Sequence, residues 1–146
     1  MVEKQNQILS CWKETLHQKG FRVTEPRLQV MEILLSSEKA LSPQEIFEIS
    51  LAEDGSLGIA SVYRTLEMLE ELNLVQQIHQ PGGCHAFWPA LEGHQHLMIC
   101  KKCGRMVEIP GSENIGAYIQ RIEEKTGFEV EDHWLQLFGS CQHCRN

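Results

Sequence analysis

The stretch GIASVYRTLEMLEELNLV, residues 58–75, decides the fold. Its apolar residues Val62, Leu66 and Leu69 recur every three or four positions, which predicts a helix with one face in a core. The helical pattern runs into LVQQIH, residues 74–79, whose composition is typical of a strand. The stretch therefore predicts a helix that leads directly into a β-strand.

Three more helices are predicted before this one. Apolar residues at helical spacing indicate a helix over about residues 5–19. A second helix is expected in VTEPRLQVMEILLSS, with Thr24 as its N-cap and Pro26 in its first turn. A third begins at SPQE, where Ser42 and Glu45 form a capping box.

A β-hairpin is predicted after the fourth helix, because QPGG separates the strand-like runs LVQQIH and CHAFW. Three helices followed by a hairpin form the layout of a winged helix-turn-helix, whose last helix enters the DNA major groove. The residues expected at DNA are Ser61, Tyr63, Arg64 and Thr65. The alternative is that these four residues are a surface turn of an ordinary helix.

A domain boundary is predicted at PALEG, residues 89–93, because proline and glycine loosen a chain. It separates a winged-helix domain, residues 1–88, from a small α/β domain, residues 94–146. In the second domain HLMIC and RMVEI are predicted strands, ENIGAYIQRIEEKTG a helix, and FEVEDHWLQLFGS one or two further strands. The expected fold class is α+β.

The composition limits the cellular setting and the partners. The chain has 146 residues, of which 42% are hydrophobic, and no apolar run approaches the roughly 18 residues that span a bilayer. The N-terminal stretch has no signal-peptide core, so we expect a soluble, cytoplasmic protein without a membrane partner. The net charge of −7 counts against a generic nucleic-acid binder but permits a compact basic site.

Four of the six cysteines form two C-x-x-C pairs, which predict a zinc site. Four thiolates satisfy the tetrahedral preference of Zn²⁺ and leave no open position, so the site is expected to be structural. The alternatives are a redox dithiol or four unrelated cysteines, but a redox C-x-x-C normally opens a helix, whereas these pairs follow strands. The predicted ligands are Cys100, Cys103, Cys141 and Cys144.

A second, separate metal site is predicted around a histidine pair. His94 and His96 alternate along one extended segment, so both side chains face the same side, and Glu108 on the next strand is expected to reach them across the sheet. For each histidine alone, a surface or hydrogen-bonded role is the alternative. Further candidate ligands in the same region or beside the hairpin turn are His79, Cys84, Glu113 and His133.

Together these stretches resemble the ferric uptake regulator (Fur) family of metal-responsive bacterial repressors. The resemblance extends over about residues 8–145. It is carried by GFRVTEPRLQVMEIL, by residues 58–75, by GHQHLMICKKCG and by CQHC. It implies a homodimer in which the winged helix binds an inverted-repeat operator, the second domain dimerises, and a regulatory metal joins the two domains.

The resemblance also implies roles for individual residues. Tyr63 and Arg64 become DNA contacts, and Arg27 in the entry segment becomes a candidate contact. The sensing ligands would be His79, His94, His96 and Glu108, with Cys84 beside them. Glu113 and His133 match a further metal site found in some members.

The sequence departs from the family pattern where the metal would be chosen. The step from His96 to Cys100 is one residue longer than the commonest spacing, and SEKALSPQE lacks the histidine of iron-type members. Because the thiolate of Cys84 favours zinc, Zn²⁺ is expected as the regulatory metal over Fe²⁺ or Mn²⁺. An iron-responsive repressor is the alternative, with a peroxide-responsive one, which more often has Asp at the position of Glu108, ranked third.

The function expected from the sequence is repression of metal-uptake genes in response to intracellular divalent metal, without enzymatic activity and without a small-molecule substrate. A hypothesis from another class is a metalloenzyme with a catalytic zinc on His94 and His96 and Glu108 as general base. That hypothesis leaves the recognition-helix pattern without a role.

Overall fold

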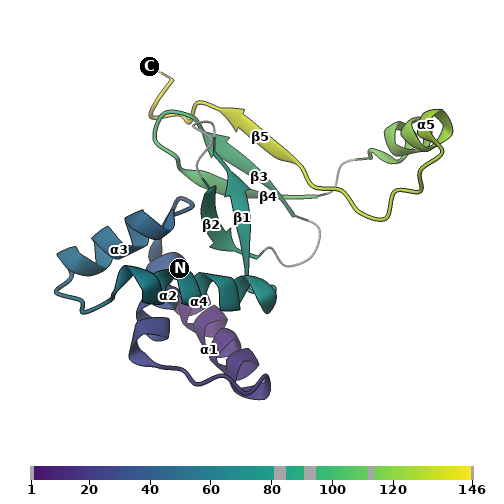
Figure 1. Cartoon of the computed structure of the whole chain (residues 1–146). Helices are drawn as coiled ribbons and strands as arrows, with labels where there is room; N and C mark the ends of the chain where they lie inside the picture. Colours follow the sequence, from purple (N-terminus) through teal and green to yellow (C-terminus); the bar gives the residue numbers. More distant parts are fainter. Residues whose placement is uncertain (1, 81–84, 91–94, 112–113, 146) are drawn as a thin grey trace. The chain divides into compact units, whose positions relative to one another are not determined.

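The computed structural model describes residues 2–80, 85–90, 95–111 and 114–145. The chain divides into two compact units, Met1–Ala90 and Leu91–Asn146, and each is described by itself (Figure 1). Within the described ranges, no helix combines the length and the apolar character needed to cross a bilayer.

The first unit contains four helices and a two-stranded antiparallel hairpin. These elements are α1 (Val2–Gln18), α2 (Glu25–Ser36), α3 (Pro43–Ala52), α4 (Ile59–Glu71), β1 (Val75–His79) and β2 (His85–Pro89). A backbone bridge between Leu41 and Phe87 ties the α2–α3 connection to β2, with N–O distances of 3.1 and 2.8 Å. The predicted order of helices followed by a hairpin is confirmed.

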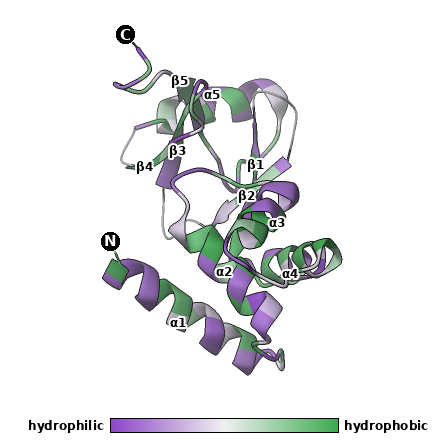
Figure 2. Ribbon diagram, turned by 90° about the vertical axis from the view of Figure 1, so that its left-hand side faces the viewer, coloured by the Kyte–Doolittle hydropathy of each residue, from purple (hydrophilic) through white to green (hydrophobic). Residues whose placement is uncertain are grey.

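The core of the first unit lies among its helices and the base of the hairpin. Hydrophobic and hydrophilic residues alternate in bands along α1, as expected for a helix with one buried face (Figure 2). The residues predicted to point inward from α4, Val62, Leu66 and Leu69, are all buried. They join a cluster that includes Trp12, Leu16, Val30, Met31, Leu34, Leu41, Ile46 and Val75.

The N-termini of α2 and α3 differ in their capping. Ser42 and Glu45 form the predicted capping box on α3, since Ser42 Oγ accepts from Glu45 N at 3.1 Å and Glu45 Oε2 accepts from Ser42 N at 2.8 Å. Thr24 occupies the N-cap of α2 as predicted but makes no side-chain capping hydrogen bond. The N-terminal turn of α2 thus keeps its backbone donors for another acceptor.

Replacing Ser42 with alanine should therefore destabilise the first unit by about 1 kcal/mol, because the backbone N–H of Glu45 loses its side-chain acceptor. Thr24→Ala is the matched control and should cost less, since its hydroxyl caps nothing in the structure. Urea unfolding followed by circular dichroism would measure both changes. Equal losses of unfolding free energy in the two variants would contradict the capping role of Ser42.

The second unit contains one helix and a three-stranded sheet in the order β4-β3-β5. The central strand β3 (Gln95–Cys100) pairs antiparallel with β4 (Met106–Pro110) and parallel with β5 (Gln136–Gly139). The helix α5 (Gly116–Thr126) ends at Gly127, whose φ of 73° forms the predicted glycine cap. Residues 128–140 thus supply one strand, and no residue of α5 is buried.

The connection between the units begins after the hairpin. Pro89 is the last residue of β2, and the Ala90 backbone N–H donates to Leu74 O at 2.9 Å, so both residues belong to the first unit. The rest of the predicted 89–93 hinge lies outside the described residues, and its role stays a prediction.

Candidate metal centre and nucleic-acid interface

The four predicted zinc ligands come together in the second unit. One sulfur from each of Cys100, Cys103, Cys141 and Cys144 lies within 4.8 Å of the others. Cys100 ends β3, and Gly104, with a φ of 76°, turns the first knuckle back so that Gly104 N donates to Cys100 O at 2.9 Å. The second knuckle follows β5, which pairs with β3, so the parallel pairing of two distant strands assembles the cluster.

The surroundings of the Cys100 sulfur favour its thiolate. Cys141 N donates to Cys100 Sγ at 3.3 Å, and Cys103 Sγ lies 3.8 Å from Cys141 Sγ. The backbone N–H groups of Cys103 and Cys141 lower the pKa of the Cys100 thiol to about 6, whereas the hydrogen bond with the Cys141 thiol raises the pKa of Cys144 to about 12. Four clustered sulfurs of which one ionises readily fit a soft, tetrahedral cation such as Zn²⁺.

A second cluster in this unit pairs two histidines that are 37 positions apart. His96 is only 3% exposed, and its ring centroid lies 5.4 Å from that of His133, with the ring planes tilted by 45°. Two imidazoles on one tetrahedral ion, with metal–nitrogen bonds of about 2.1 Å, have centroids roughly 5 Å apart. The described pair therefore has the spacing of two ligands of one ion.

The expectation that Glu108 reaches His96 across the sheet is wrong. In the β3–β4 register Glu108 is opposite Leu97, and His96 is opposite Ile109. Residues directly opposite each other share a face of a sheet and neighbours along a strand alternate, so Glu108 and His96 project from opposite faces. The structure thus pairs His96 with His133 and leaves Glu108, which is exposed, on the other face.

The other candidate ligands are only partly covered by the structure. His79 ends β1, is exposed, and lies directly opposite His85 at the start of β2. Cys84, His94 and Glu113 lie outside the described residues. His85 was not among the predicted ligands, because the predicted four-residue turn QPGG, residues 80–83, places Cys84 and not His85 opposite His79.

A basic hollow of about 510 Å³ opens on the first unit at the N-terminal ends of α2 and α4. Three arginines contribute to it, and none of its lining residues is acidic. The residues that line it are Gly20, Phe21, Arg22, Thr24, Pro26, Arg27, Ser61, Arg64 and Thr65.

Both helices that open onto this basic hollow lack side-chain caps. The N-caps of α2 and α4, Thr24 and Gly58, make no side-chain capping hydrogen bond. Backbone N–H groups at uncapped helix N-termini bind phosphate oxygens, and the helix dipole favours the negative charge. The hollow thus combines two helix N-termini with three guanidinium groups, a combination suited to the phosphates of a DNA backbone.

The arginines of the hollow are held in place by local contacts. Arg27 Nη1 donates to Arg22 O at 2.7 Å, and the Arg27 guanidinium lies 5.6 Å from the centroid of the Phe21 ring. Arg64 Nη2 donates to Ser61 Oγ at 3.3 Å. Arg22 was missed in the sequence because no helical pattern marks it, and only the adjacency of two chain segments, 20–27 and 61–65, brings it beside Arg64.

Two predicted DNA contacts take different roles in the structure. Tyr63 is 54% exposed and presents its ring to solvent from α4. Thr65 is 3% exposed, and its hydroxyl donates to Ser61 O at 2.7 Å. Thr65 lines the basic hollow while its hydroxyl donor is used inside the helix, and its contact with DNA stays a prediction.

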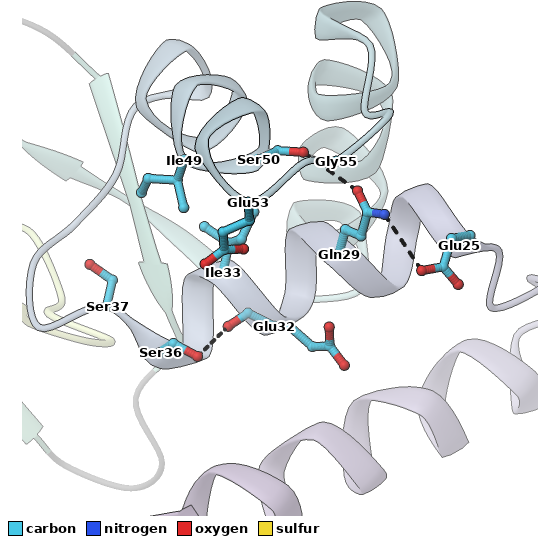
Figure 3. Close-up of a pocket in the computed structure, with 10 residues that line it drawn as sticks. All are labelled: Glu25, Gln29, Glu32, Ile33, Ser36, Ser37, Ile49, Ser50, Glu53 and Gly55. Carbon is cyan, nitrogen blue, oxygen red and sulfur yellow. Dashed lines mark hydrogen bonds between the residues drawn. The ribbon is translucent and has the colours of Figure 1, made fainter.

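A second hollow on the first unit, of about 680 Å³, lies between α2 and α3 and has the opposite charge. Its lining, drawn in Figure 3, includes Glu25, Gln29 and Glu32 of α2 and Glu53, the C-cap of α3. Gln29 Nε2 donates to Glu25 Oε1, and Ser50 Oγ donates to Gln29 Oε1, each at 3.5 Å. Its carboxylates repel phosphate, so this hollow is not suited to a DNA backbone.

Comparisons with known proteins agree with this arrangement. Residues 18–138 match the model of the ferric uptake regulator family. The ferric uptake regulation protein of Campylobacter jejuni is 35% identical over 143 residues, which cover 95% of this chain and 89% of that protein.

Two solved structures are also similar. The ferric uptake regulator of Helicobacter pylori is 25% identical, with a TM-score of 0.69 over 97% of this chain and 94% of that one. A zinc uptake regulator bound to zinc and DNA, 21% identical, shares the fold, with a TM-score of 0.68 over 95% of this chain and 93% of that one. With the family model matching most of its length, the chain belongs to the ferric uptake regulator family.

Proposed function

We propose that the chain is a homodimeric repressor of metal-uptake genes whose affinity for operator DNA rises when it binds Zn²⁺. Membership of the Fur family makes it a metal-responsive, DNA-binding transcription regulator and not an enzyme, which removes the catalytic-zinc hypothesis. The observation that carries the proposal is the pair of His96 and His133, whose ring centroids lie 5.4 Å apart and which is separate from the four-cysteine group.

The basic hollow is proposed to bind the operator backbone. Arg22, Arg27 and Arg64 would neutralise phosphates, while the exposed Tyr63 on α4 would face the bases in the major groove. The acidic hollow on the same unit would repel DNA approaching in another orientation. A protein with a net charge of −7 can therefore bind DNA through one strongly basic site.

The second unit is proposed to form the dimer. In the described part of the chain β5 pairs with β3 on one side only, so its other edge is available to a second copy. Large apolar side chains are exposed on β5 and just before it, namely Trp134, Leu135, Leu137 and Phe138. An edge strand with such side chains is costly in water and is covered by isologous pairing with its own copy.

The regulatory metal is proposed to bind His96 and His133 together with His94, two residues before His96 in the sequence. A second set, His79, Cys84 and Glu108, is proposed as further ligands of a regulatory metal, and Glu113 is kept as an additional candidate. The solved structure of the H. pylori ferric uptake regulator is described as having three functional metal-binding sites, a precedent for more than one site in a similar chain.

Zinc is proposed as the regulatory metal on chemical grounds. The thiol of Cys84 suits Zn²⁺ better than Fe²⁺, and SEKALSPQE, residues 37–45, contains no histidine. Fe²⁺ is the second candidate, because the relative with 35% identity is named a ferric uptake regulation protein. The metal would act by preferring the DNA-competent state, and a tenfold preference corresponds to about 1.4 kcal/mol.

The experiment that tests the proposal compares His96→Ala and His133→Ala with the unchanged chain. Each variant should keep one zinc on the four cysteines but lose most of a roughly tenfold or larger gain in DNA affinity on adding Zn²⁺. Fluorescence anisotropy with an inverted-repeat duplex would measure the affinity, and elemental analysis the bound zinc. Gln95→Ala, a neighbour of His96 on the same strand, is the control and should retain the gain.

A full metal response in both histidine variants would overturn the assignment of the regulatory site. Loss of the tetrathiolate zinc together with the response would mean that the two sites are not separate. A response of the unchanged chain to Fe²⁺ but not to Zn²⁺ would replace the proposed metal and leave the site unchanged.

A further inference from the structure

Three hydrogen bonds join the first knuckle of the cysteine cluster to the segment that carries the second. Lys101 N donates to Gly139 O at 2.8 Å, and Cys141 N donates to Cys100 Sγ at 3.3 Å. The third differs in kind, because the ammonium of Lys102 donates to Cys144 O at 2.6 Å. A side chain from one knuckle thus holds the backbone of the other.

The two backbone bonds hold only the beginning of the second segment. They end at Gly139, the last residue of β5, and at Cys141, the first sulfur after it. Residues 140–145 belong to no helix or strand, and Cys144 is otherwise held by the local turn in which its N–H donates to Cys141 O at 2.9 Å. Besides the sulfur contacts within the cluster, the bond from Lys102 thus joins the backbone of Cys144 to the first knuckle.

We propose that Lys102 is a positioning residue for the metal centre, which fixes Cys144 as the fourth ligand and slows metal release. The proposal rests on the proposed occupancy of the four cysteines by zinc and not on the regulatory metal. A hydrogen bond from a charged donor is stronger than one between neutral groups. It also restrains the knuckle before any metal arrives, which reduces the entropy lost on binding.

The physical effect concerns the first step of metal loss. A metal ion would leave a four-thiolate site by first losing one cysteine ligand. A ligand on a segment outside any helix or strand would be lost most readily. Lys102 would keep the Cys144 segment close to the other three sulfurs, so its removal should raise the rate of zinc release by roughly three- to tenfold, about the contribution of one typical hydrogen bond.

The test measures zinc transfer from the purified full-length chain to an excess of a chromogenic chelator. Lys102→Met should release zinc several-fold faster than the unchanged chain, whereas Lys102→Arg, which keeps a charged donor, should restore most of the slow release. Lys101→Met is the matched control, because it removes the same charge from the adjacent position. The side chain of Lys101 makes none of the three bonds, so its release rate should equal that of the unchanged chain.

A spectroscopic measurement separates positioning from general destabilisation. With Co²⁺ in place of zinc, the d–d bands report the tetrahedral geometry of the four sulfurs. Lys102→Met should shift or broaden these bands while the far-ultraviolet circular dichroism stays unchanged, and Lys101→Met should leave them as they are.

Equal zinc release from Lys102→Met and Lys101→Met, with identical Co²⁺ spectra, would overturn the proposal. Failure of the proposed function would give a different result. In that case DNA binding would not respond to metal, while zinc release would still be slow in the unchanged chain and faster in Lys102→Met. A chain purified without zinc that takes up none would refute the occupancy on which the proposal depends.

Discussion

Replacing Cys100 with serine is expected to abolish zinc binding at the four cysteines and to unfold the second unit. Cys100 is buried at the end of the central strand β3, and its sulfur accepts the backbone N–H of Cys141. The unit has a small core, α5 contributes no buried residue to it, and a structural zinc contributes on the order of 10 kcal/mol in small metal-dependent domains. Loss of the metal therefore removes more stability than such a unit has in reserve.

Circular dichroism, elemental analysis and the oligomeric state by light scattering would measure these losses. The control is Cys11→Ser, because Cys11 is an exposed cysteine on α1 in the other unit and should have no effect on zinc. A Cys100→Ser chain that retains one zinc and remains a folded dimer would refute the structural role of the cluster.

Arg64→Ala should weaken operator binding by roughly tenfold or more, and Arg22→Ala combined with Arg27→Ala by a larger factor. The three guanidinium groups line one hollow at two uncapped helix N-termini, so each removal leaves a phosphate without its partner. Loss of one phosphate contact also lowers the salt dependence of log affinity by about one unit.

The comparison should be made by titration at several salt concentrations. Lys39→Ala serves as the charge control, because Lys39 belongs to the same unit and pairs with Glu45 at 3.3 Å, outside the hollow. If Lys39→Ala and Arg64→Ala weakened binding equally, the effect would reflect net charge alone and the basic hollow would not be the DNA interface.

The features that the sequence predicts well are those whose chemistry is local. Ser42 and Glu45 are three residues apart, so their capping box depends only on the helix that they begin. Each C-x-x-C pair forms one short turn that presents two sulfurs. Because Zn²⁺ needs four ligands, the two turns are expected to lie together. The helix 59–71 was visible from one apolar face, because a helix repeats its face within a single stretch.

The features that the sequence does not predict depend on pairing between distant segments. Whether Glu108 shares a face with His96 depends on the β3–β4 register, where a shift of one residue reverses every face. The pairing of His96 with His133 likewise requires the position of the segment before β5, which no local pattern specifies. Arg22 and Arg27 meet Arg64 only because the segments 20–27 and 61–65 pack together.

The central claim is that a metal separate from the tetrathiolate zinc controls DNA binding. The most direct test is the DNA affinity of the unchanged chain with one zinc per chain on the four cysteines, measured across buffered free Zn²⁺, Fe²⁺ and Mn²⁺. The expected result is a rise in affinity of roughly tenfold or more as a second metal binds, at the lowest free concentration for Zn²⁺. An affinity that stays constant across all three metals, while the second metal is shown to bind, would contradict the claim.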